Sequence, residues 1–218
     1  MTILDKSEVE RLYDNQASNY DASLTIFRLL GVNKWRASLV RQLELSTGDT
    51  VVDLCCGTGA NIELLAQAVG ETGRMIGVDL SSEMLAIARE KAVSCGLSNV
   101  ELVQADVEKF RLPSSTSAVL STFGLEMVPQ YESVVSNVAS QLPSDGRLGL
   151  LGLKHPENWP DWLISLGIWM TKKYGVTREY EQFHPWEAAD KYFQTSHFEQ
   201  RLAGAAYICL AQHPQIDG

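Results

Sequence analysis

Three aspartates follow three short apolar segments in the first half of the chain, and their types and spacing could bind a nucleoside. Asp53 lies in VVDLCCGTGAN, Asp79 ends MIGVD and Asp106 ends VQAD. The carboxyl ends of parallel strands share one edge of a sheet, where ligands bind. Carboxylates accept hydrogen bonds, whereas ribose hydroxyls and an adenine amino group donate them. The pattern therefore predicts Asp79 at a ribose and Asp106 at an adenine.

Gly57 and Gly59 make the turn after the first of these segments. Glycines let ligand atoms approach the backbone, and the helix that follows offers unpaired N–H groups. A dinucleotide site would have a third glycine where this chain has Ile62, and its diphosphate would be repelled by Asp53. The turn favours an adenosine with a positively charged tail, with a nicotinamide-dependent oxidoreductase kept as an alternative.

The elements that must position these residues alternate along the chain. We expect strands at VVDL, RMIGVDLS, NVELVQAD, SAVLSTFG and DGRLGLLGLK, with amphipathic helices between them. HFEQRLAGAAYICLAQ predicts two more strands, separated by about two residues around Gly204. The fold class expected is α/β, with a doubly wound, mostly parallel seven-stranded sheet and an antiparallel C-terminal hairpin.

We expect one domain with four parts. Apolar spacing predicts helices before the sheet, broken at Gly31, and a segment rich in tryptophan after the fifth strand is too aromatic for a plain connector. The four parts are an N-terminal helical cap (1–46), a cofactor-binding core (47–153), a helical substrate lid (154–194) and the hairpin (195–218).

Composition excludes several classes of function. The formal net charge of −9 opposes binding to a nucleic-acid backbone. The four cysteines show no metal-ligand spacing, so we expect neither a metal site nor a disulfide framework. No apolar run reaches the roughly 18 residues of a membrane span, and the first residues lack a signal peptide's apolar region. These features predict a cytoplasmic protein, with transient membrane contact and a homodimer left open.

Four motifs together carry a family resemblance: VVDLCCGTG, IGVDLSSEML, QADVEKF and STFGLEMVPQYE. In order and spacing they resemble the motifs of class I S-adenosylmethionine-dependent methyltransferases, over about residues 8–153. The leader YDNQASNYDA is similar to the branch of ubiquinone/menaquinone-biosynthesis and phospholipid N-methyltransferases. One position departs from the pattern, because Cys55 stands where the family has its first glycine. We expect Cys55 to tolerate enlargement poorly.

The resemblance implies S-adenosylmethionine as cofactor and a role for each matching residue. The methionine end would be bound by Asp53 and the turn of Cys55, Gly57 and Gly59, the ribose by Asp79, and the adenine by Asp106, Val107, Leu80 and Met84. Phe123 and Gly124 would lie under the donor methyl, and Tyr13 and Tyr20 would close the pocket.

The acceptor side is predicted from fewer residues. His155, after the fifth strand, and His184 are candidate bases, with Tyr20 and Tyr180 beside them. Glu126 would attract a cationic amine, and Trp162 and Trp169 would form a hydrophobic lid. Packing in the core or in a dimer contact is the alternative for these tryptophans.

The function expected is methyl transfer to a small hydrophobic or amphipathic acceptor such as a quinone precursor, a phospholipid head group or a natural product. A non-catalytic cofactor-binding protein is the main alternative, and an aminopropyl transferase is a remote one.

Overall fold

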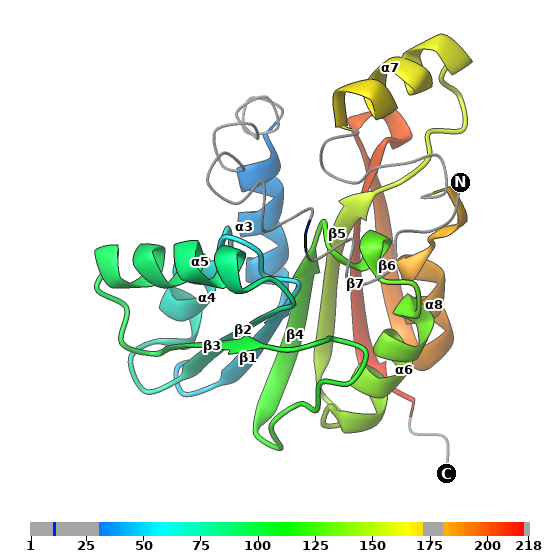
Figure 1. Ribbon diagram of the computed structural model, residues 1–218. Coiled ribbons are helices and arrows are strands. Elements are labelled where there is room, and N and C mark those ends of the chain that lie inside the picture. Colours follow the sequence, from blue (N-terminus) through cyan, green and yellow to red (C-terminus); the bar gives the residue numbers. More distant parts are fainter. Residues whose placement is uncertain (1–10, 12–30, 172–180, 216–218) are drawn as a thin grey trace.

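The computed structural model describes residue 11, residues 31–171 and residues 181–215, and its centre is one seven-stranded sheet (Figure 1). The strand order is β3-β2-β1-β4-β5-β7-β6. The first five strands are parallel, and β7 is antiparallel to both β5 and β6. The predicted fold class is confirmed. The strands are β1 (Thr50–Leu54), β2 (Arg74–Asp79), β3 (Val100–Gln104), β4 (Thr116–Thr122), β5 (Arg147–Leu153), β6 (Phe193–Arg201) and β7 (Ala206–Pro214).

Helices cover both faces of this sheet. In Figure 1, α3, α4 and α5 lie on one side, α6 and α8 lie on the other, and α7 stands beyond the carboxyl end of β5. The bounds are α3 (Val32–Gln42), α4 (Ile62–Val69), α5 (Ser82–Ser94), α6 (Tyr131–Gln141), α7 (Asp161–Thr171) and α8 (Pro185–Tyr192), with short 3-10 turns η1 (Leu125–Met127) and η4 (Leu202–Gly204).

Alternation along the strands divides the core into two layers. Val51 and Met75 pack with Leu39 of α3 on one face. Val52 and Ile76, one residue further along each strand, pack with α6 and α8 on the other face. A strand buried on both faces needs a continuous apolar run, which is what VVDL and RMIGVD contain.

Local sequence features mark the ends of several helices. Ser81 caps α5, since its hydroxyl accepts a hydrogen bond from Met84 N. Gly96 follows the same helix with φ +67°, a left-handed conformation that glycine adopts without strain. Gly31, with φ +85°, is the N-cap of α3, as its predicted break implies.

The C-terminal part differs from the prediction in two ways. β6 begins at Phe193, earlier than expected, and its turn to β7 runs from Leu202 to Ala205 instead of about two residues. Within this turn Leu202 and Ala203 are both left-handed, at φ +51° and +49°. The predicted lid also contains α8, which packs on the sheet through Ala188 and Ala189. Its small residues permit that close contact.

Candidate functional site

The site lies where the strand order reverses. The chain builds β1, β2 and β3 outward in one direction, and β4 then pairs with the opposite side of β1. Ligands of open parallel sheets bind at this point, beyond the carboxyl ends of the strands. The structure brings the predicted acids together there around Cys55. The pKa of the Cys55 thiol is raised well above its ordinary value, mainly by burial. The negative charges of four nearby acids raise it further: Asp79, Asp53, Glu126 and Asp106.

The two glycines of the turn after β1 serve different purposes. Both are left-handed, with φ +54° at Gly57 and +76° at Gly59. A Cβ added to Gly59 would overlap Ile62 Cδ1 and lie 3.2 Å from the Ala88 side chain, so this glycine lets α4 and α5 pack on the turn. A Cβ added to Gly57 would meet no atom of the described residues within 4 Å. Among these residues, Gly57 therefore leaves open space beside the turn.

Cys55 adopts the backbone conformation that a glycine would favour. Its φ is +56°, and a Cβ added to Gly124 would overlap the Cys55 Cβ. The cysteine side chain therefore lies directly against the backbone of the turn after β4. This contact gives a physical reason for the expected intolerance of enlargement at Cys55.

Asp79 connects two backbone segments. One carboxylate oxygen accepts a hydrogen bond from Gly57 N at 2.8 Å, and the other accepts one from Ser81 N at 3.0 Å. It thus joins the turn after β1 to the start of α5. Each carboxylate oxygen can accept two hydrogen bonds, so this geometry fits a carboxylate that also receives ribose hydroxyls.

Asp53 is fully buried, and only one of its two carboxylate oxygens forms a hydrogen bond with the described residues. Its Oδ2 accepts a hydrogen bond from Asn61 Nδ2 at 3.0 Å, whereas Asp53 Oδ1 and Asn61 Oδ1 have no hydrogen-bond partner among the residues that the structure describes. Burial raises the pKa of Asp53 to about 7, against the opposing effects of the Asn61 bond and the Arg36 charge. Buried polar atoms nearly always have partners, so two buried oxygens that lack one in the described part of the chain suit a ligand group that donates hydrogen bonds, such as an ammonium.

Sequence reasoning missed three residues of this network. Asn61 Nδ2 also donates to Thr122 Oγ1 at 3.0 Å, and Arg36 Nε lies 3.5 Å from the same hydroxyl. The Arg36 guanidinium also lies 5.3 Å from the centre of the Phe123 ring. Asn61 stands in the glycine stretch and carried a detectable signal. Arg36 and Thr122 carried none, because a helix arginine and a strand threonine are ordinary in those positions.

The residues predicted around the adenine lie in different environments. Asp106 Oδ1 accepts a hydrogen bond from Glu108 N at 3.0 Å, which forms a turn after β3. Val107 and Met84 are buried, and Leu80 is half-buried. Met84 is 2% exposed, so its side chain belongs mainly to the core. The adenine contacts of these residues remain predictions.

On the acceptor side, the two candidate histidines meet at one glutamate. His155 Nδ1 lies 3.2 Å from Glu181 Oε1, and His184 Nε2 lies 2.9 Å from the Glu181 carbonyl oxygen. His184 is also the N-cap of α8, with its Nδ1 3.1 Å from Glu187 Oε1. The structure thus places His155 and His184 against the same residue, and His184 stands at the start of α8, before Pro185.

Comparison with known proteins shows which family this chain belongs to. Residues 1–168 match the ubiE/COQ5 methyltransferase family. The chain belongs to this family. A demethylmenaquinone methyltransferase of Oceanobacillus iheyensis is 31% identical over 154 residues, which are 69% of this chain and 64% of that protein. The chain therefore covers less than two thirds of that relative's length.

Solved structures show the same fold. A methyltransferase of Aquifex aeolicus, described as S-adenosylmethionine-dependent, has a TM-score of 0.57 at 18% identity, over 82% of this chain and 89% of that one. A phosphoethanolamine N-methyltransferase of Haemonchus contortus, solved with S-adenosylhomocysteine, has a TM-score of 0.66 at 16% identity, over 84% and 53%. The predicted family and S-adenosylmethionine as its cofactor are confirmed.

In this ubiE/COQ5 family member, the four tryptophans after β5 lie in three different environments. Trp162 and Trp169 on α7 are 68% and 73% exposed. Trp159 Nε1 donates to the Ala203 carbonyl, and Trp186 packs edge-on to Tyr207 at 4.6 Å. The lid roles of Trp162 and Trp169 remain predictions, and packing in the core accounts for Trp186. Tyr13, Tyr20 and Tyr180 lie outside the described residues.

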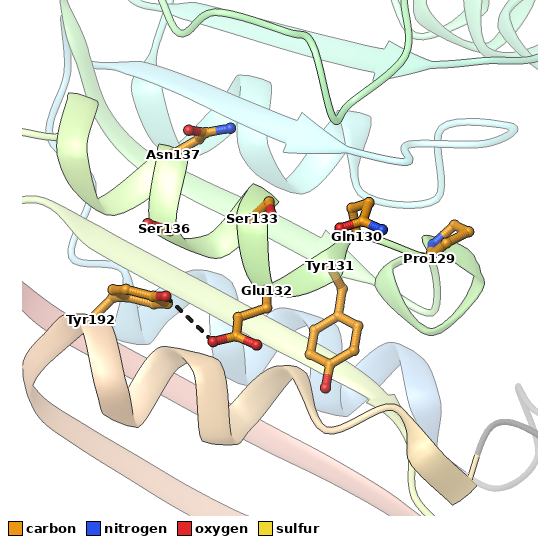
Figure 2. A pocket seen from close by; sticks show the side chains of 8 residues that line it. All are labelled: Pro129, Gln130, Tyr131, Glu132, Ser133, Ser136, Asn137 and Tyr192. Carbon is orange, nitrogen blue, oxygen red and sulfur yellow. Dashed lines mark hydrogen bonds between the residues drawn. The ribbon is translucent and has the colours of Figure 1, made fainter.

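A separate pocket of about 400 Å³ lies between α6 and α8. Figure 2 shows its polar lining, with Tyr192 bonded to Glu132. It contains none of the predicted cofactor residues, so we place the candidate site at the strand ends instead. In the described part of the chain, no group of three or more His, Cys, Asp or Glu side chains could hold a metal ion, and no helix is long and apolar enough to cross a membrane.

Proposed function

We propose that this chain transfers the methyl group of S-adenosylmethionine to a small apolar or amphipathic acceptor of the reduced-quinone type. Membership of the ubiE/COQ5 family and relatives named demethylmenaquinone methyltransferase support this choice. For the cofactor, the observation that carries the proposal is the pair of buried oxygens on Asp53 and Asn61 that lack a partner among the described residues, in the same stretch of chain as Gly57. An ammonium group at the end of an adenosine would supply the missing donors.

Different residues at the strand ends would then bind different parts of the cofactor. Asp79 would accept the ribose hydroxyls, Asp106 the adenine amino group, and the buried pair of Asp53 and Asn61 the methionine ammonium. Asp79 and Asp106 contribute negative charge near the turn, which suits a ligand whose sulfur is cationic.

When bound, S-adenosylmethionine supplies a methyl group on a positively charged sulfur, already activated for in-line displacement. The protein's part is alignment and exclusion of water, and alignment alone can contribute several kcal/mol. His155, whose Nδ1 lies 3.2 Å from Glu181 Oε1, would accept the proton of the acceptor hydroxyl. Phe123 and Gly124 would form the floor beside the reacting atoms.

Calorimetry with S-adenosylhomocysteine tests the cofactor pocket. Asp79→Ala should weaken binding by about 2–4 kcal/mol, because it removes a charge-assisted pair of hydrogen bonds. Asp49→Ala is the matched control. Asp49 also accepts two hydrogen bonds, from Ser46 N and Ser117 Oγ, but at the opposite edge of the sheet. Equal affinity of Asp79→Ala and wild type would place the ribose elsewhere.

Turnover tests the acceptor. The wild-type chain, S-adenosylmethionine and a reduced short-chain demethylmenaquinone should give a product one methyl group heavier, detected by mass spectrometry. Methylation of ethanolamine phosphates instead would show that the acceptor is a phospholipid head group and not a reduced quinone.

A non-catalytic cofactor-binding protein is the second candidate. The observation in its favour is Cys55, whose side chain occupies the contact with Gly124 that a family glycine would leave open. Binding of S-adenosylhomocysteine without methyl transfer to any of these acceptors would favour it. Gain of turnover in Cys55→Gly would then identify the cysteine as the cause.

A further inference from the structure

Glu126 is a buried carboxyl group outside the three strand-end aspartates. It lies in η1, directly after the turn that leaves β4, and it is 6% exposed. Tyr207 Oη donates a hydrogen bond to Glu126 Oε1 at 3.0 Å, and Tyr207 itself is 1% exposed. A carboxyl group buried this deeply is costly unless its hydrogen bonds are satisfied, so an apolar residue would be the simpler filler.

The strand between the two partners makes room for their contact. Gly152 of β5 pairs with Tyr207 of β7. A Cβ added to Gly152 would overlap Glu126 Oε1 and lie 2.9 Å from Tyr207 Cε1. The absence of a side chain at Gly152 thus lets the Glu126–Tyr207 bond pass across the end of β5.

The bond anchors a turn that faces the candidate site. We call Phe123–Met127 the β4 turn. Phe123 is left-handed, with φ +57°, and its N–H donates to the Leu151 carbonyl at 2.7 Å. Gly124 lies against Cys55 on the site side of the same turn. The β4 turn is therefore held by Cys55 on one side and by Tyr207, through Glu126, on the other.

Tyr207 is in turn fixed by aromatic packing. Its ring lies 4.6 Å from Trp186 of α8 and 6.0 Å from Phe198 of β6, centre to centre. Rigid neighbours of this kind limit the positions that the Tyr207 hydroxyl can take. The β4 turn is thus tied to the antiparallel end of the sheet through Tyr207.

We propose that Glu126 is a positioning residue, which sets the β4 turn on the acceptor side of the site through its bond to Tyr207. The proposal rests on the proposed function, because it assigns Phe123 and Gly124 to the floor beside the reacting atoms. It replaces a role for Glu126 in attracting a cationic amine, since the carboxyl group is bonded inside the protein.

The test separates binding of the cofactor from turnover. Glu126→Gln and Tyr207→Phe should bind S-adenosylhomocysteine within about twofold of wild type in calorimetry. Their kcat with reduced short-chain demethylmenaquinone should fall about tenfold or more, because misalignment acts on the chemical step. Circular dichroism at the assay temperature confirms that each variant is folded.

Tyr192→Phe is the matched control. Tyr192 also donates to a glutamate, Glu132, at 3.3 Å, but this exposed pair joins α6 and α8 away from the strand ends (Figure 2). Its kcat should equal that of wild type. A folded Tyr207→Phe with kcat within twofold of wild type would overturn the proposal even if Glu126→Gln did not fold. A wild-type chain that binds no S-adenosylhomocysteine would instead overturn the proposed function, and the positioning role with it.

Discussion

The cofactor half and the acceptor half of the site are built from different kinds of residue. Around β1 and β2 the polar groups are buried or half-buried and belong to strand ends and the turns that follow them, as with Asp53, Asn61 and Asp79. Beyond β5 the candidate groups are partly exposed and lie on loops and short helices, as with His155, Glu181 and Trp162. The difference indicates a rigid pocket for a constant ligand, beside a surface that can vary with the acceptor.

The largest expected effect is on the stability of the fold, and it distinguishes Gly57 from Gly59 in the turn after β1. Gly59→Ala should destabilise the fold by about 2–5 kcal/mol, because a left-handed Cβ also overlaps Ile62. Gly57→Ala should cost only about 1–2 kcal/mol, since its Cβ meets no atom in the described part of the chain. Urea unfolding measures the first quantity. Calorimetry should show that Gly57→Ala loses at least tenfold in S-adenosylhomocysteine affinity, and equal stability losses would contradict the distinction.

Asp53 predicts a pH dependence of stability. Its pKa is raised from 3.8 to about 7 in the folded chain, so between these values the folded state holds a proton that the unfolded state has released. Stability should therefore fall as pH rises from about 4 to about 7 and then level off, by an amount on the order of 4 kcal/mol. The measurement is the unfolding free energy against pH.

The control for this pH effect is Asp53→Asn, which should flatten part of the slope. Glu126 contributes a slope of the same sign, because burial raises its pKa from 4.5 to about 7. A wild-type stability that rises between pH 4 and 7 would show that other groups outweigh both acids.

The histidines give the next effect on the acceptor side. His155→Ala should lower kcat about 100-fold, the usual contribution of a general base, with cofactor affinity unchanged. His184→Ala should lower it less, because its ring is engaged with Glu181 and Glu187 at the start of α8. Steady-state turnover of the reduced quinone compares them. The reverse order would move the base to His184.

The smallest expected effect is at α7. Replacing Trp162 and Trp169 by Ala should raise the acceptor KM about five- to tenfold and leave S-adenosylhomocysteine affinity unchanged, because both rings are exposed beyond the strand ends. Val93→Ala, at another exposed apolar side chain, is the control. Equal weakening of cofactor and acceptor binding, or of neither, would refute the lid.

The part of the site nearest the glycine turn was predictable because its signals are local. A buried strand, a carboxylate at its end and a glycine turn lie within a few consecutive residues, and the acids at 53, 79 and 106 share one edge once the strands are parallel. Ser81 shows the same principle at a helix start. The sequence could not show that Trp186 packs in the core while Trp162 is exposed, because both lie in the same tryptophan-rich segment.

The sequence by itself determined the α/β class, the family and the strand ends that face the ligand, since periodicity and turn residues act over short distances. Only the tertiary structure decided which distant residues meet there. Thr122 joins Asn61 across 61 positions, Tyr207 reaches Glu126 across 81, and Gly124 lies against Cys55. Such contacts depend on strand order and register, which no single segment encodes.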